Sequence, residues 1–170
     1  MIIARLSCFV VTVVGFVLVH GQQTTLSAYP TTKGYLSVIH PLFTIDRNGT
    51  QYNFSGTYTV GFPCGIQILK SDKLGFTFEL TPFIKSDGSN SKMTNLLFHP
   101  GIMCRYKHGF GITYRMAFET SGRYGFTTIF GKTIIKTKAN SYFIAIPLPL
   151  RFGNNLPPSA GLGIQLGVVF

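Results

Sequence analysis

Residues 161–170 read GLGIQLGVVF, with a large apolar side chain at every second position. Successive side chains of a β-strand point to opposite faces of a sheet. The segment is therefore predicted to be a strand with one apolar face and one face made largely of glycine. The apolar face consists of Leu162, Ile164, Leu166, Val168 and Phe170.

The same alternation runs through most of the chain. It is clearest in TYTVGFPCGIQILK at 57–70, in GFGITYRMAFE at 109–119 and in SYFIAIPLPLRF at 141–152. A period of two residues indicates half-buried strands, and no convincing stretch after residue 22 has the helical period. Weaker alternation, which brings the prediction to eight strands, is found at 34–45, 74–85, 95–106 and 123–135.

The connections between the predicted strands fall into two classes. The tight ones, SDK, KHG and KTKAN, alternate along the chain with connections that are longer or richer in turn residues. In an up-and-down arrangement the two classes lie at opposite ends of the sheet. Long loops at one end, short turns at the other and an even number of strands are typical of transmembrane barrels.

Two assignments of the apolar face compete. In a soluble barrel this face would form the core, and the solvent face would be glycine, threonine, alanine and proline, which makes a poorly soluble surface. In a membrane barrel the apolar face meets lipid and the small polar face fills the lumen. Only 12% of the residues are charged, about half the usual share. The sequence therefore predicts an all-β fold, an eight-stranded antiparallel up-and-down transmembrane β-barrel over 34–170.

Aromatic residues at the strand ends favour the membrane assignment. Tyr106, Tyr142 and Phe170 fall at the tight-turn end of their strands, and Tyr124 and Phe152 fall at the other end. Two such girdles mark the interfaces of transmembrane barrels.

Six prolines lie inside predicted strands, where proline removes a hydrogen bond from the ladder. We expect bulges or kinks at some of them, and a bulge changes the facing of the residues beyond it. They are Pro41, Pro63, Pro82, Pro100, Pro147 and Pro149.

The N-terminal residues 1–21 are predicted to be a signal peptide. Arg5 precedes an apolar run from Leu6 to Val19, and the small Gly21 stands before the polar Gln22. The alternative is an uncleaved anchor, because the apolar run is almost long enough to span a bilayer. Residues 22–33 are then a short periplasmic segment before the barrel.

A phenylalanine that closes an alternating strand resembles the C-terminal assembly signal of bacterial outer-membrane barrels. With the predicted signal peptide and eight strands, residues 34–170 are similar to the small outer-membrane β-barrel family of Gram-negative bacteria, which includes OmpX-like and PorT-like proteins. The resemblance rests on pattern and has no diagnostic motif. It implies a bacterial outer-membrane location, contact with outer-membrane lipids and lipopolysaccharide, and insertion by the outer-membrane assembly machinery.

Seven ionisable side chains face the predicted lumen by strand parity. An eight-stranded barrel is just wide enough for side chains to fill its interior, so these charges must pair, since an unpaired buried charge is very costly. A gate or anion site is one interpretation, and a salt-bridged plug that closes the barrel is the one we favour. The residues are Glu79, His99, Arg105, Arg115, Glu119, Arg123 and Arg151.

The net charge of +10 can mean an anionic partner, which for an exported chain is lipid headgroups or polysaccharide and not nucleic acid. Because the lysines are scattered singly, we favour the interpretation that they are solvated loop charges. Zinc-ligand spacing and a phosphate-binding loop are absent from the sequence, so we expect no metal, no cofactor and no enzymatic activity. The predicted role is structural, adhesive or accessory to a larger envelope complex. Three alternatives stay open: a lipid-modifying barrel enzyme with a His, Ser and carboxylate set, a small pore, and a secreted ligand-binding barrel.

Overall fold

The computed structural model describes residues 29–170, so the predicted signal peptide lies outside the described residues. Eleven antiparallel strands make up almost all of this part of the chain, and none of its helices is long and apolar enough to cross a membrane. The strands are β1 (Thr31–Asp46), β2 (Gly49–Tyr52), β3 (Tyr58–Gly61), β4 (Cys64–Leu69), β5 (Leu74–Ser86), β6 (Ser91–Phe98), β7 (Gly101–Arg105), β8 (Phe110–Glu119), β9 (Tyr124–Lys136), β10 (Ser141–Phe152) and β11 (Ser159–Val169). A 3-10 turn at Lys107–Gly109 joins β7 to β8.

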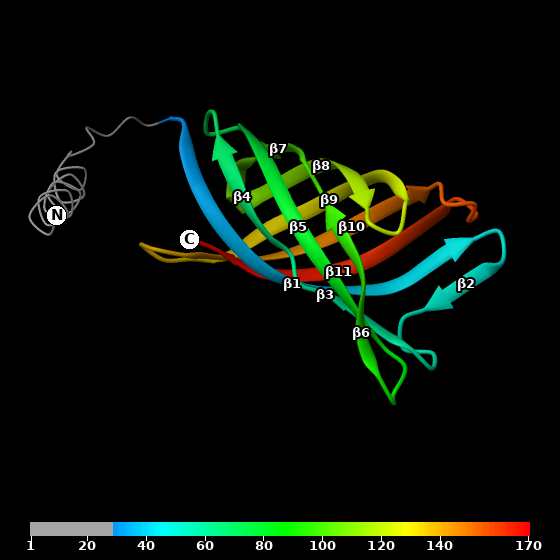
Figure 1. Cartoon of the computed structure of the whole chain (residues 1–170). Helices are drawn as coiled ribbons and strands as arrows, with labels where there is room; N and C mark the ends of the chain where they lie inside the picture. Colours follow the sequence, from blue (N-terminus) through cyan, green and yellow to red (C-terminus); the bar gives the residue numbers. More distant parts are fainter. Residues whose placement is uncertain (1–28) are drawn as a thin grey trace, which may run out of the picture.

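The sheet closes on itself through its first and last long strands. β11 pairs with β1 over a register that runs from Tyr35 opposite Val169 to Ile45 opposite Ala160. Between them, β3 and β4 lie beside β5, and β6 and β7 lie between β5 and β8. Figure 1 shows the blue β1 and the red β11 side by side along this seam. The interior of this ring is where the polar side chains gather.

The structure divides the sheet into eleven strands where the sequence predicts eight. β3 and β4 are the two halves of the predicted strand 57–70, and they separate at Pro63. β6 and β7 are likewise the halves of 95–106, separated at Pro100. Proline has no N–H to give to the ladder, which explains both breaks. The remaining extra strand, β2, forms a hairpin with β1 in a region that the sequence leaves as a loop.

The other prolines also disturb the ladders, as predicted. The β1–β11 register shifts between Pro41 and Phe43, and the β5–β6 register shifts directly after Phe83, next to Pro82. Pairing of β10 with β11 stops at Ala145 and resumes at Leu150, which brackets Pro147 and Pro149. These irregularities give the closed sheet its local bends without opening the ring.

Exposure divides the two faces of the sheet as alternation predicts. On β8, Tyr114 and Met116 are 55% and 49% exposed, whereas Thr113, Arg115 and Ala117 are at most 8% exposed. The same division holds for most residues of the other long strands, although the apolar Leu69, Leu97 and Ile129 are buried together with the polar and small side chains. The fold therefore carries its apolar surface outward and buries its charges.

Candidate functional site

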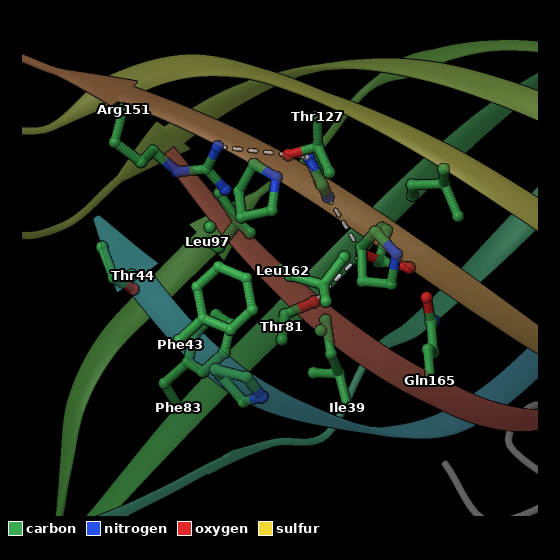
Figure 2. A pocket seen from close by; sticks show the side chains of 18 residues that line it. Ile39, Phe43, Thr44, Thr81, Phe83, Leu97, Thr127, Arg151, Leu162 and Gln165 are labelled. Carbon is green, nitrogen blue, oxygen red and sulfur yellow. Dashed lines mark hydrogen bonds and ion pairs between the residues drawn. The ribbon is translucent and has the colours of Figure 1, made fainter. Parts of the chain in front are cut away.

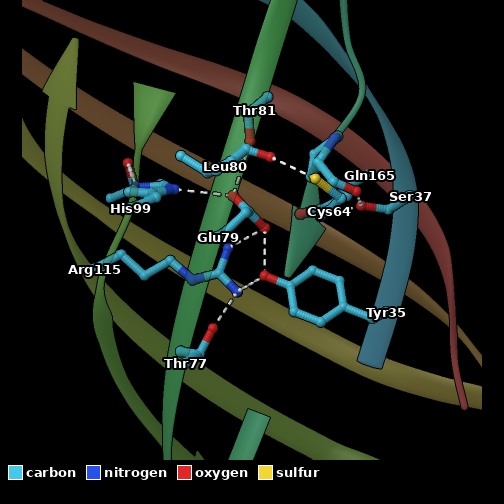
Figure 3. Close-up of polar contacts among 12 residues, drawn as sticks. Tyr35, Ser37, Cys64, Thr77, Glu79, Leu80, Thr81, His99, Arg115 and Gln165 are labelled. Carbon is cyan, nitrogen blue, oxygen red and sulfur yellow. Dashed lines mark hydrogen bonds and ion pairs between the residues drawn. The ribbon is translucent and has the colours of Figure 1, made fainter. Parts of the chain in front are cut away.

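A buried carboxylate, Glu79, lies at the centre of the polar interior, and β5 places it there. Its Oε2 atom is 2.5 Å from Nη1 of Arg115 and accepts a hydrogen bond from the Tyr35 hydroxyl at 2.8 Å. Its Oε1 atom accepts from Nδ1 of His99 and from the Thr81 hydroxyl, both at 3.1 Å. The Glu79 side chain is 4% exposed and has four partners, which come from β1, β8, its own strand β5 and the β6–β7 connection (Figure 3).

Arg115 completes this central cluster from β8. Its Nη2 atom donates to the Tyr35 hydroxyl at 2.9 Å and to the Thr77 hydroxyl at 3.0 Å. Its guanidinium carbon lies 5.7 Å from the centre of the Tyr35 ring. The Nε atom of Arg115 is buried and has no hydrogen-bond partner among the described residues.

Two glycines provide the room that this cluster needs. Gly101 lies opposite Arg115 in the ladder, and a Cβ at Gly101 would lie 2.6 Å from Arg115 Cγ. A Cβ at Gly65 would lie 2.6 Å from the Tyr35 hydroxyl oxygen. Both distances are far inside van der Waals contact, so the large interior side chains are packed directly against glycine backbone.

A second cluster lies nearer the long-loop end of the sheet. Nε of Arg151 is 2.6 Å from Oε1 of Glu119, and both side chains are about nine-tenths buried. Arg123 donates from Nη2 to the backbone oxygens of Arg151 at 3.2 Å and Pro157 at 2.9 Å, and to the Ser159 hydroxyl at 3.1 Å. This arginine therefore ties β9 to the loop between β10 and β11.

His99 and Thr127 connect the two clusters. Nδ1 of His99 faces the Glu79 carboxylate, which can only accept, so Nδ1 donates and Nε2 is free to accept from the Thr127 hydroxyl at 2.9 Å. The Thr127 oxygen in turn accepts from Nη1 of Arg151 at 3.1 Å. An unbroken line of hydrogen bonds thus runs from Arg115 to Glu119.

The structure brings together six of the seven predicted lumen residues in these two linked clusters. Arg105 stands apart, because it lies at the short-turn end on β7 and forms none of the three ion pairs of the described residues. Sequence reasoning missed the uncharged partners. They face inward by the same parity. The pattern that could have identified them is a hydroxyl side chain on the inner face of a strand, beside a charged side chain. These residues are Tyr35, Thr77, Thr81, Thr127 and Ser159.

Most of the predicted assembly-signal residues occupy the outer face of the seam, whereas Leu162, at the register shift of the β1–β11 ladder, is part of the lining of an interior cavity. Ile164, Leu166 and Phe170 are 37%, 51% and 56% exposed, and Leu162 and Val168 are half-buried. Phe170 pairs with Gly34 through two backbone hydrogen bonds of 2.9 and 3.0 Å. A Cβ at Gly34 would collide with the Phe170 ring, so the ring lies across this glycine.

The network separates two cavities of the interior. The smaller, of about 70 Å³, is lined by Glu79, His99 and Thr127 together with mostly apolar side chains; Figure 2 shows Phe43 and Phe83 beside it. The larger, of about 330 Å³, lies at the short-turn end and has Arg115 and Tyr35 in its lining. Within residues 29–170 there is no group of three or more His, Cys, Asp or Glu side chains that could hold a metal ion.

Thr127, His99 and Glu79 form a hydroxyl, imidazole and carboxylate series, which is the order used in acyl transfer. Two features of this series are unlike an activated nucleophile. The carboxylate also pairs with Arg115, and the hydroxyl, on a side chain that is 3% exposed, accepts from Arg151. The arrangement primarily cross-links strands β1, β5, β8, β9 and β10.

No model of a protein family matches this sequence, and no curated protein matches it. Among solved structures, a chain described as "De novo design of transmembrane beta-barrels" is similar over 84% of this chain and 96% of its own length, with 12% sequence identity and a TM-score of 0.49. The resemblance to small outer-membrane barrels stays a prediction from the sequence.

Proposed function

We propose that this protein is an integral β-barrel of the bacterial outer membrane, with a largely blocked polar interior and a non-enzymatic role that is structural or accessory to an envelope complex. The observation that carries the proposal is the distribution of side chains in the closed sheet. Charges that pair inside and large apolar groups that face outward are the reverse of a soluble barrel.

The outer face supports a lipid environment along its whole circumference. Phe78 on β5, Phe126 on β9 and Leu166 on β11 are 42%, 55% and 51% exposed. A monomer in water does not expose apolar groups on every strand of one face, because contiguous patches of this kind lead to association. In a bilayer the same groups are in their preferred solvent.

Exposed aromatic residues at the two ends of the sheet match two membrane interfaces. Tyr106 and Phe170 are 58% and 56% exposed at the short-turn end, and Tyr124 is 56% exposed at the other. Tyr and Phe rings at headgroup level anchor a barrel at a fixed depth. Lipids and lipopolysaccharide would contact the belt between them, and the assembly machinery would insert it.

The linked charge clusters support a blocked interior and not a pore. Glu79 and Arg115 meet in the middle of the ring, and their neighbours Tyr35, Thr77 and Thr81 are at most 2% exposed. Side chains fill the interior of a barrel with few strands, and an open aqueous channel needs a barrel with many more strands.

Fractionation with heat-modifiable gel mobility tests the proposal. An outer-membrane barrel sediments with the outer membrane, resists extraction by high salt, and migrates differently in gels before and after boiling. Recovery of the folded protein in the soluble periplasm would instead identify the secreted ligand-binding barrel.

One observation favours a second candidate, a lipid-modifying enzyme. The Thr127 hydroxyl is 2.9 Å from His99, which is 3.1 Å from Glu79, and an apolar cavity adjoins the three side chains. Ester hydrolysis that disappears in both Thr127→Val and His99→Gln, with unchanged heat-modifiability, would establish this function. Equal background hydrolysis in the wild type and both variants is the result expected for a structural network.

A further inference from the structure

The interior cavity at the short-turn end carries positive charge without a carboxylate. Its volume is about 330 Å³, and its lining includes five cations: Lys33 from β1, Arg105 from β7, Arg115 from β8, and Lys132 and Lys136 from β9. The Nζ atom of Lys132 lies 4.1 Å from the centre of the Phe110 ring. None of the five acidic residues of the chain is part of the lining. Asp72, which stands in the turn between β4 and β5 at this end, accepts a hydrogen bond from Tyr29.

Apart from Lys132, the cations of the lining lie at two levels of this cavity. Arg105 pairs with Gly111 in the β7–β8 ladder, whereas Arg115 lies four residues further along β8, which at ~3.3 Å per residue is roughly 13 Å deeper. Lys33 is the third residue of β1 and Lys136 is the last residue of β9, so both lie near the strand ends at the short-turn end. Three cations therefore surround the mouth, and one guanidinium forms the floor.

Between mouth and floor the walls carry apolar and polar side chains in similar measure. Leu69, Met103, Ile129 and Phe143 are among the apolar ones, and the Phe143 ring packs edge-on against Tyr35 with centroids 6.5 Å apart. Gln67, Thr113 and Gln165 are among the polar ones. The apolar side chains would take the body of a ligand and the mouth its charge.

We propose that this cavity binds a small organic phosphate, with the phosphate among Lys33, Arg105 and Lys136 and the organic part directed toward Arg115. A phosphate ester carries close to two negative charges near pH 7 and accepts several hydrogen bonds. Arginine suits it through its fork of N–H donors, and lysine suits it as a point charge. The inference rests on the closed sheet and its cavity and does not depend on the proposed membrane location.

Calorimetric titration of the full chain in uncharged maltoside micelles, at pH 7 and low salt, tests the site with phenyl phosphate as the probe. We expect saturable binding of one phenyl phosphate per chain, with inorganic phosphate and phenol each binding at least about tenfold more weakly. Arg105→Gln and Lys33→Gln should each weaken phenyl phosphate about five- to tenfold. Each variant is first shown to be folded by its heat-modifiable mobility.

The matched control is Lys92→Gln, which removes the same charge from an exposed position on β6 that does not line the cavity. Its affinity for phenyl phosphate should equal that of the wild type. Absence of saturable binding, equal affinity for inorganic and phenyl phosphate, or an equal loss in Lys92→Gln and Arg105→Gln would each overturn the proposal.

Discussion

Glu79 and Arg115, on β5 and β8, form an ion pair with 2.5 Å between Oε2 and Nη1, and their side chains are 4% and 7% exposed. β5 and β8 are not neighbours over this level, because β7 pairs with both of them. The pair therefore bridges across β7 on the inner face and connects strands that share no ladder there. Loss of one partner would leave the other as an uncompensated buried charge, which is far more costly than loss of the whole pair.

Arg115→Ala is expected to lower the free energy of unfolding by about 3–5 kcal/mol, because it removes the counter-charge of Glu79, and to let small ions pass. Denaturant titration in lipid vesicles and planar-bilayer conductance measure the two effects. Glu79→Gln combined with Arg115→Gln should cost less than Arg115→Ala, since no charge is then left unpaired. Arg47→Ala, in the exposed turn between β1 and β2, is the control, and an unchanged midpoint and conductance in Arg115→Ala would contradict the assignment of the plug.

The close contact of Gly65 with Tyr35 gives a second prediction. Gly65→Ala would place a methyl group against the backbone oxygen of Phe78, which is its nearest neighbour, and 2.6 Å from the Tyr35 hydroxyl oxygen. The backbone of the β4–β5 ladder would have to shift, and the hydroxyl would be pushed away from Glu79. Overpacking of this kind costs about 1–3 kcal/mol, and thermal or denaturant unfolding would reveal it.

Gly131→Ala is the matched control for this contact. Gly131 also faces inward, on β9, but its added Cβ would meet the Ala145 Cβ at an ordinary 3.7 Å. We expect this variant to unfold like the wild type. Equal destabilisation by the two alanines would show that the loss of glycine's backbone flexibility, and not the close contact with Tyr35, sets the cost.

Alternation alone was enough to place the charged interior. Side chains repeat every two residues in a strand, so Glu79, His99 and Arg115 could be assigned to the inner face, and counting from the turns put them at one height. The same counting placed Glu119 and Arg151 near the long loops, where they form their ion pair.

Three features could not be read from the alternation. Tyr35 and Thr127 carry no charge, so nothing in the pattern marks them as the links of the network. The breaks at Pro63 and Pro100 depend on where neighbouring strands place their hydrogen bonds, which sets the strand number. Gln165 belongs to a face of small residues, and only its neighbour across the seam reveals that it donates to the Ser37 hydroxyl at 2.8 Å.

Lysine substitutions at two exposed apolar positions test whether lipid or water covers the outer face. Ile146, in the middle of β10, is 46% exposed, and Leu156, in the loop between β10 and β11, is 51% exposed. A lysine that faces the bilayer midplane costs about 2–4 kcal/mol, so Ile146→Lys should destabilise the protein in lipid vesicles and Leu156→Lys should not. If water covers both positions, the two variants will unfold alike.

The ring of Phe170 gives the last prediction, because its backbone and its side chain have separable roles. The backbone N–H and C=O of Phe170 pair with Gly34 at 2.9 and 3.0 Å, and these bonds persist in Phe170→Ala, which removes only the exposed ring. If the assembly machinery recognises that ring, Phe170→Ala should reduce the amount of protein in the outer membrane of cells, while the purified variant refolds into lipid vesicles as well as the wild type does. Val169→Ala, which changes the adjacent residue and keeps the ring, is the control and should insert normally. Equal amounts of Phe170→Ala and wild type in the outer membrane would show that the ring is not a signal, and poor refolding in vesicles would show that it stabilises the seam instead.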